Sequence, residues 1–163
     1  MKNTFDFTAV NKYLNLPEAI NKARFALIDY EIANHGYIPL DKAVTILMEN
    51  GLSDSEKLLD ELIKNNYISL GPTDEIGYLY PVSCEETDHR VKLADGREFY
   101  AMCAIDAMGC AATFGMDVEI FSYCKDTEDP VYAKITPDGI SEITPANMYV
   151  SYYDSWAEGC INY

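Results

Sequence analysis

Apolar residues recur every three or four positions over the first third of the chain, with polar residues between them. This spacing is typical of amphipathic helices, which pack one face against a core. It predicts a helix that begins at Pro17 and ends at Gly36, and a second that runs from Leu40 to Gly51. A third helix is expected after Ser53, where a Ser-x-x-Glu capping box would close its first turn.

The period changes to that of strands after the third helix. Residues 67–70 and 76–80 flank a Gly-Pro-Thr-Asp-Glu segment, which predicts a strand, a turn and a strand. Three helices followed by a hairpin are the arrangement of a winged-helix module. The third helix carries mostly acidic side chains, which repel phosphate, so we expect a structural or interaction module that does not bind DNA.

Beyond Pro81 the pattern predicts further strands around one apolar, Ala-rich helix. The helix is expected from Tyr100 to Gly115, after a hairpin turn that carries Asp-Gly. The strands are expected at residues 87–93, 118–124, 130–135 and 147–153.

The predicted fold class is α+β. An N-terminal winged-helix-like three-helix module with a hairpin precedes a mixed catalytic domain, in which antiparallel strands pack on a central helix. The expected divisions are an N-terminal arm at 1–16, the winged-helix-like module at 17–81 and the catalytic domain at 82–163.

Composition limits the classes of function that the chain can have. The chain has 163 residues and a net charge of −15, which opposes binding to nucleic acid. No stretch approaches the roughly 18 apolar residues of a membrane span, and the start lacks the apolar core of a signal peptide, so we expect a cytoplasmic protein without a membrane partner. Five cysteines, an odd number, argue against a disulfide framework.

The expected central helix carries unusual chemistry. Cys103, Asp106 and Cys110 are spaced i, i+3 and i+7, so they would share one face of a helix. Thiolates are soft metal ligands, and a carboxyl group in apolar surroundings has a raised pKa and can carry a proton. This set suits the cleavage of a carbon–metal bond. A buried cysteine is often a small core residue, but a carboxylate on an apolar face needs a partner or a purpose.

These residues resemble a known family. The segment Tyr100-Ala-Met-Cys-Ala-Ile-Asp106 is similar to the Tyr-Ala-Trp-Cys-Ala-Leu-Asp signature of organomercurial (alkylmercury) lyases. The segments Ile76-Gly-Tyr78 and Ile135-Thr-Pro137 are similar to family segments as well. Met102 stands where the signature has Trp, and Cys110 stands where the family has a bulky residue.

The resemblance implies a protonolysis of R–Hg–X to R–H and Hg(II). Cys103 would be the nucleophile that binds mercury, Asp106 the proton shuttle and Cys160 the second catalytic cysteine. The implied metal ligands are Cys103, Cys160 and Asp106, with Cys110 as a candidate addition, while Cys124 would be structural. The resemblance implies no organic cofactor: mercury is the metal of substrate and product, and a low-molecular-weight thiol or a metal-accepting protein takes it away.

A second hypothesis stays open. The same thiols, Cys103 and Cys160 with Cys110 as a candidate third, would also suit a non-catalytic protein that binds a soft metal as a carrier or sensor. A thiol–disulfide enzyme is disfavoured because the chain contains no Cys-x-x-Cys pair. Release of a hydrocarbon separates the first two hypotheses.

Overall fold

The computed structural model describes residue 13 and residues 15–150. Within these residues the chain forms four helices and eight strands. The helices are α1 (Glu18–Asn34), α2 (Leu40–Glu49), α3 (Ser55–Lys64) and α4 (Ala104–Phe114). The strands are β1 (Ser69–Leu70), β2 (Ile76–Leu79), β3 (Val82–Ser83), β4 (Arg90–Leu93), β5 (Glu98–Ala101), β6 (Val118–Tyr123), β7 (Pro130–Thr136) and β8 (Gly139–Thr144).

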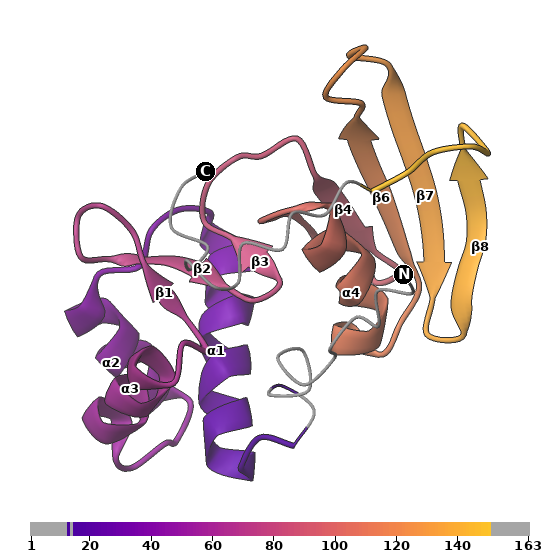
Figure 1. Cartoon of the computed structure of the whole chain (residues 1–163). Helices are drawn as coiled ribbons and strands as arrows, with labels where there is room; N and C mark the ends of the chain where they lie inside the picture. The colour runs from indigo at the N-terminus through magenta and orange to yellow at the C-terminus, as the bar shows by residue number, and fades with distance from the viewer. Residues whose placement is uncertain (1–12, 14, 151–163) are drawn as a thin grey trace, which may run out of the picture.

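All eight strands form one antiparallel sheet in the order β1-β2-β3-β5-β4-β6-β7-β8. Helices α1 to α3 gather around β1 to β3, while α4 packs against β4 to β7 (Figure 1). The predicted α+β class is therefore confirmed. The sheet also joins the two halves of the chain, because β2 pairs with β3 and β3 pairs with β5.

The helical half follows the hydrophobic period closely. Helix α1 begins directly after Pro17, and α2 runs from Leu40 to Glu49, as the spacing predicted. The expected hairpin forms from β1 and β2, with Ser69 opposite Tyr78. The prediction of a capping box at Ser53 is wrong, because α3 begins at Ser55 and no side chain caps its first turn.

The strand half shows one wrong prediction. Strands β4, β6 and β7 lie where the alternation placed them, but residues 147–150 form no strand, and residues 151–153 lie outside the described residues. The third strand of this part is β8 instead, and β7 pairs with β6 along one edge and with β8 along the other. Nearly every residue of β8 is exposed, so it carries no apolar alternation that the sequence pattern could reveal.

The apolar segment from Tyr100 to Gly115 is only partly helical. Tyr100 belongs to β5, and α4 begins at Ala104, so the prediction of one continuous helix is wrong at its start. The helix ends as expected at Gly115, whose φ of 65° is the left-handed conformation that glycine adopts without strain.

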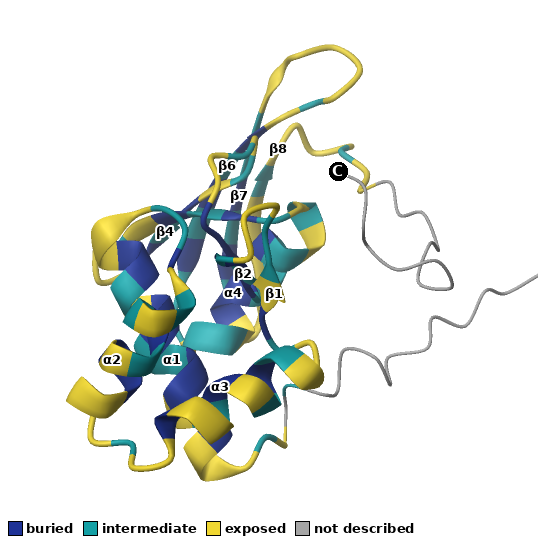
Figure 2. Ribbon diagram, turned by 90° about the vertical axis from the view of Figure 1, so that its left-hand side faces the viewer, coloured by how far each residue is buried: buried dark blue, intermediate teal, exposed yellow. Residues whose placement is uncertain are grey.

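The core lies between the helices and the sheet. Figure 2 shows the helices with buried positions on the side that faces the interior and exposed positions on the other. The largest fully buried side chains include Leu27 and Ile28 of α1 and Phe99 of β5, while Ala107 and Cys110 bury the inner face of α4. Among the described residues, no helix combines the length and apolar character needed to cross a membrane.

Candidate functional site

The junction between β5 and α4 positions Cys103. The chain leaves the sheet at the buried Ala101 and enters the helix at Ala104, and Cys103 between them has an extended backbone with φ −154° and ψ 174°. The carbonyl of Cys103 accepts the first helical hydrogen bond, from the amide of Ala107, at 2.9 Å. Cys103 is therefore the N-cap residue of α4, and its thiol lies where the helix dipole favours negative charge.

Asp106 lies in the first turn of the same helix and contacts this thiol. Cys103 Sγ donates a hydrogen bond to Asp106 Oδ2 over 3.1 Å. Burial raises the pKa of Asp106 to about 6, while the hydrogen bond from Cys103 acts in the opposite direction. A carboxyl with this pKa both accepts and returns a proton near neutral pH, which is what proton transfer requires.

The Cys103 thiol keeps its proton in the absence of a metal. Burial of the sulfur and the negative charge of Asp106 raise the pKa of Cys103 to about 12. The residue as a whole is nevertheless exposed, so a ligand can reach it from solvent. When a soft metal displaces the thiol proton, the acceptor of that proton, Asp106, is already in contact with the sulfur.

Cys110 lies on the inner side of α4. Its side chain is completely buried, and its Sγ donates to the backbone carbonyl of Asp106 over 3.3 Å. Burial, together with the charge of Asp106, raises the pKa of this thiol strongly. The prediction that one helix carries both Cys103 and Cys110 is wrong at Cys103, which precedes the helix and is exposed, whereas Cys110 lies within α4 and is buried.

The remaining predicted ligand, Cys160, lies outside the described residues. Within the described part of the chain, no group of three or more His, Cys, Asp or Glu side chains could hold a metal ion. Cys103 and Asp106 are thus the two predicted site residues whose side chains hydrogen-bond to each other in the described part of the chain. Cys124 follows β6 and is half-exposed, and its structural role stays a prediction.

Tyr80 is a neighbour of this pair that the sequence interpretation did not include. A Cβ added at Gly109 would lie 2.8 Å from Tyr80 Oη, so the phenol lies against α4 one turn beyond Asp106. Burial, together with the charges of Asp106 and Cys110, raises the pKa of Tyr80 to about 12. The available signal was Gly109 itself, since a glycine within an Ala-rich helix often marks a close approach.

A buried arginine holds Tyr80 from the other side. Arg24 of α1 is only 2% exposed, and its guanidinium donates to the backbone carbonyl of Tyr80. Its guanidinium carbon lies 5.0 Å from the ring centroid of Tyr13, and that ring stacks on Tyr80 with centroids 4.3 Å apart. None of the ion pairs formed within residues 15–150 involves Arg24, so aromatic faces surround this buried cation.

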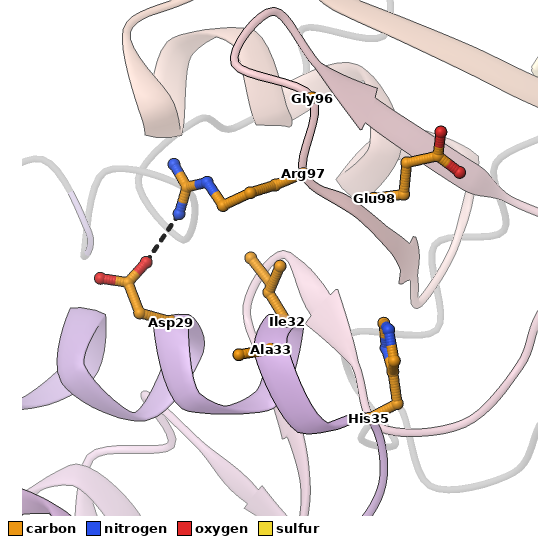
Figure 3. A pocket seen from close by; sticks show the side chains of 7 residues that line it. All are labelled: Asp29, Ile32, Ala33, His35, Gly96, Arg97 and Glu98. Carbon is orange, nitrogen blue, oxygen red and sulfur yellow. Dashed lines mark hydrogen bonds and ion pairs between the residues drawn. The ribbon is translucent and has the colours of Figure 1, made fainter.

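A separate hollow lies between α1 and the turn from β4 to β5, with a volume of about 550 Å³ (Figure 3). Arg97 crosses it, with Nη1 2.7 Å from an oxygen of Asp29 and Nε 2.9 Å from Asp95. The lining contains neither Cys103 nor Asp106, and its arginine is already paired. The Arg97–Asp29 ion pair therefore joins α1 to the sheet at this hollow, and the hollow is not the thiol site.

Comparisons with known proteins fit the chemistry of the Cys103–Asp106 pair. The family model described as Alkylmercury lyase matches residues 82–162. An alkylmercury lyase from Bacillus cereus is 37% identical over 57 residues, which make up 35% of this chain and 26% of that protein. An alkylmercury lyase from Staphylococcus epidermidis is 33% identical over 72 residues, or 44% of this chain and 33% of that protein. The match thus spans about a quarter to a third of the length of these curated relatives.

The fold agrees with this family. A crystal structure of the mercury-bound form of MerB2 is similar to the chain with a TM-score of 0.58 at 19% identity, over 85% of this chain and 68% of that one. The contact between Cys103 and Asp106 falls inside the residues that the family model matches. Through residues 82–162, the chain belongs to the alkylmercury lyase family.

Proposed function

We propose that the chain cleaves carbon–mercury bonds by protonolysis, releasing a hydrocarbon and Hg(II). The observation that carries this proposal is the 3.1 Å contact between Cys103 Sγ and Asp106 Oδ2. It joins a soft nucleophile to a proton carrier at an exposed position, inside the range that matches the family. The substrate class is a small organomercurial, R–Hg–X.

The first step loads mercury onto Cys103. The sulfur forms a bond to mercury, X⁻ leaves, and the thiol proton passes to the Asp106 carboxylate in contact with it. The product is R–Hg–S–Cys103 beside a protonated Asp106. Burial favours this neutral carboxyl, because it raises the pKa of Asp106 to about 6.

The second step breaks the carbon–mercury bond. Asp106 gives its proton to the carbon atom, the bonding electron pair stays with carbon, and R–H leaves while Asp106 returns to the carboxylate. Hg(II) remains on Cys103, and we propose that the Cys160 thiolate is its second ligand, its own proton passing to solvent. Two external thiols then remove the metal and return both cysteines to the thiol form, without an organic cofactor.

The removal step fits a compartment rich in reduced thiols. Low-molecular-weight thiols keep cysteines reduced in the cytoplasm, and we propose that they, or a metal-accepting protein, are the partners that take Hg(II) there. Cys110 is a candidate additional ligand in this scheme. Its complete burial and its bond to the carbonyl of Asp106 favour a packing role.

We further propose a division of the chain into an arm at 1–16, a winged-helix-like module at 17–81 and a catalytic domain at 82–163. The order of three helices and the β1–β2 hairpin supports the winged-helix interpretation. Arg24 and Tyr80, both from this module, contribute to the surroundings of α4. We therefore propose a structural role for the module rather than DNA binding, which its acidic third helix opposes.

The direct experiment uses the full chain, purified and reduced, with phenylmercury and an excess of a small thiol. We expect benzene to appear in proportion to the phenylmercury consumed, measured by gas chromatography. A tight mercury–thiolate absorption band in the ultraviolet, formed with Hg(II) but without benzene from phenylmercury, would instead support the non-catalytic metal-binding protein. A result with no mercury–thiolate band and no benzene would contradict both hypotheses.

A further inference from the structure

We propose that Tyr80 is a positioning residue of this site, and that its hydroxyl, held over Gly109, keeps the Asp106 carboxyl turned toward Cys103. The inference rests on the proposed function, because it assigns a role in the same proton transfer. It concerns a residue outside the cysteine and aspartate set of the family signature. It requires that the ring is fixed, that the hydroxyl has space beside α4, and that Asp106 can accept a further hydrogen bond.

The ring of Tyr80 is fixed on two sides. Tyr13 stacks on it with an interplanar angle of 13°, and the Arg24 guanidinium lies 5.8 Å from its centroid. Arg24 also donates to the backbone carbonyl of Tyr80, so the same buried side chain holds both the ring and the main chain. An arginine that is 2% exposed has little freedom to move, and it restricts the ring in turn.

The absence of a side chain at position 109 gives the hydroxyl its space. Side chains on a helix lean toward its N-terminus and cover the preceding turn. Gly109 has none, so the surface over the turn that contains Asp106 stays open at this point. Tyr80 Oη fills it, since an added Cβ at Gly109 would lie only 2.8 Å away.

The Asp106 carboxylate can accept a further hydrogen bond. Oδ2 accepts the Cys103 thiol, and a carboxylate can accept several more hydrogen bonds through its two oxygens. Burial raises the pKa of Tyr80 to about 12, so the phenol keeps its proton at neutral pH and acts as a donor. A donor fixed on the helix side of the carboxyl would stop Asp106 from rotating away from the sulfur.

Four variants of the full chain test the proposal: Tyr80→Phe, Gly109→Ala, the double variant, and Tyr132→Phe as control. Tyr132 is the control because it is a tyrosine whose hydroxyl donates to a carboxylate, Glu119 Oε1 at 3.0 Å, on the sheet and away from α4. Two readouts are measured for each variant. The first is the infrared S–H stretching band of Cys103, assigned by difference from Cys103→Ser, and the second is the rate of benzene release from phenylmercury.

Tyr80→Phe is expected to move the Cys103 band toward that of a free thiol and to lower kcat roughly tenfold, with KM little changed. Gly109→Ala should do the same, because its methyl group displaces the hydroxyl. The double variant should be no worse than Tyr80→Phe, since the next ring atom, Cζ, lies 3.8 Å from the added Cβ. Tyr132→Phe should leave both readouts unchanged.

Wild-type values of both readouts in a folded Tyr80→Phe protein would overturn the proposal. Thermal unfolding identifies a variant that fails to fold, and in that case the wild-type band in Gly109→Ala would overturn it equally. A double variant much worse than either single variant would contradict the contact between the hydroxyl and Gly109. If the wild type releases no benzene, the proposed function fails, while the S–H band still decides the role of Tyr80.

Discussion

The thiol of Cys103 and the carboxyl of Asp106 lie 3.1 Å apart, although only Asp106 belongs to helix α4. The extended backbone at Cys103 turns the sulfur over the first turn of the helix. A proton that leaves the sulfur therefore has its acceptor in direct contact.

Replacing Cys103 by serine should abolish hydrocarbon release, because a hydroxyl is a poor ligand for a soft metal. Benzene from phenylmercury is the measurement. Cys124→Ser is the matched control, since Cys124 is a free and accessible thiol outside the site, and it should keep wild-type activity. Sustained turnover by Cys103→Ser would mean that another residue is the nucleophile.

Asp106→Asn should keep mercury binding but slow the formation of the hydrocarbon by about 100-fold or more, which is the usual contribution of general acid–base catalysis. Asparagine has the shape of aspartate but cannot deliver the proton. Binding is followed through the ultraviolet mercury–thiolate band and release by gas chromatography. An equal loss of binding and release would argue that Asp106 is a ligand or a structural residue and not the shuttle.

Cys110→Ala should lower stability by about 1 kcal/mol through the small cavity that it leaves, with little effect on the mercury stoichiometry. The thiol is fully buried and bonds to the carbonyl of Asp106, so its removal chiefly affects packing. Thermal unfolding and titration with Hg(II) measure the two effects. Loss of the tight mercury site would identify Cys110 as a third ligand.

Cys160→Ser should leave Hg(II) bound through Cys103 alone and therefore weaken its retention. Competition with increasing concentrations of a small thiol measures this. The variant is expected to lose its metal at about tenfold lower thiol or less, since each thiolate contributes strongly to binding of a soft ion. Retention equal to that of the wild type would exclude Cys160 as the second ligand.

Glu31 gives a prediction about stability and pH. This α1 residue is 2% exposed, its Oε2 has no partner, and burial raises its pKa to about 7. Below the pKa that Glu31 has in the unfolded chain, Glu31 is protonated in both the folded and the unfolded state, and it does not lower the free energy of unfolding. As pH rises toward 7, the unfolded state ionises first, so the free energy of unfolding falls.

Glu31→Gln should therefore stabilise the protein above pH 7 by about 1–3 kcal/mol, and the gain should vanish below about pH 4. Glutamine retains an acceptor for the backbone amide of Gly36, which bonds to the native carboxylate. Urea unfolding at several pH values measures the effect. Glu49→Gln, at an exposed position on α2, is the control and should show no such gain.

Much of the fold could be predicted from the sequence, because the helices and strands with one buried face show the corresponding period. Helix α2 and strands β6 and β7 are examples, with buried and exposed positions in regular order. Strand β8 could not be found this way, since its residues are nearly all exposed. The start of α4 was misplaced because the apolar end of β5 runs into the helix without a polar break.

The candidate site divides in the same manner. Cys103 and Asp106 are close in sequence, so their spacing alone indicated that they could meet. Tyr80 and Gly109 are 29 positions apart, and only the packing of the hairpin end against α4 brings them together. Arg24 reaches Tyr80 from α1 across a still longer separation, which no local pattern records.

The pairing of β3 with both β2 and β5 decides how this chain can be divided in the laboratory. A fragment that begins at residue 82 keeps β3 but loses β2, so one row of its backbone amides and carbonyls would be unpaired. Such an edge readily recruits a strand from another molecule, and the fragment should aggregate. Chimeras with members of the alkylmercury lyase family should therefore be joined ahead of β1, so that β1 to β3 are exchanged together.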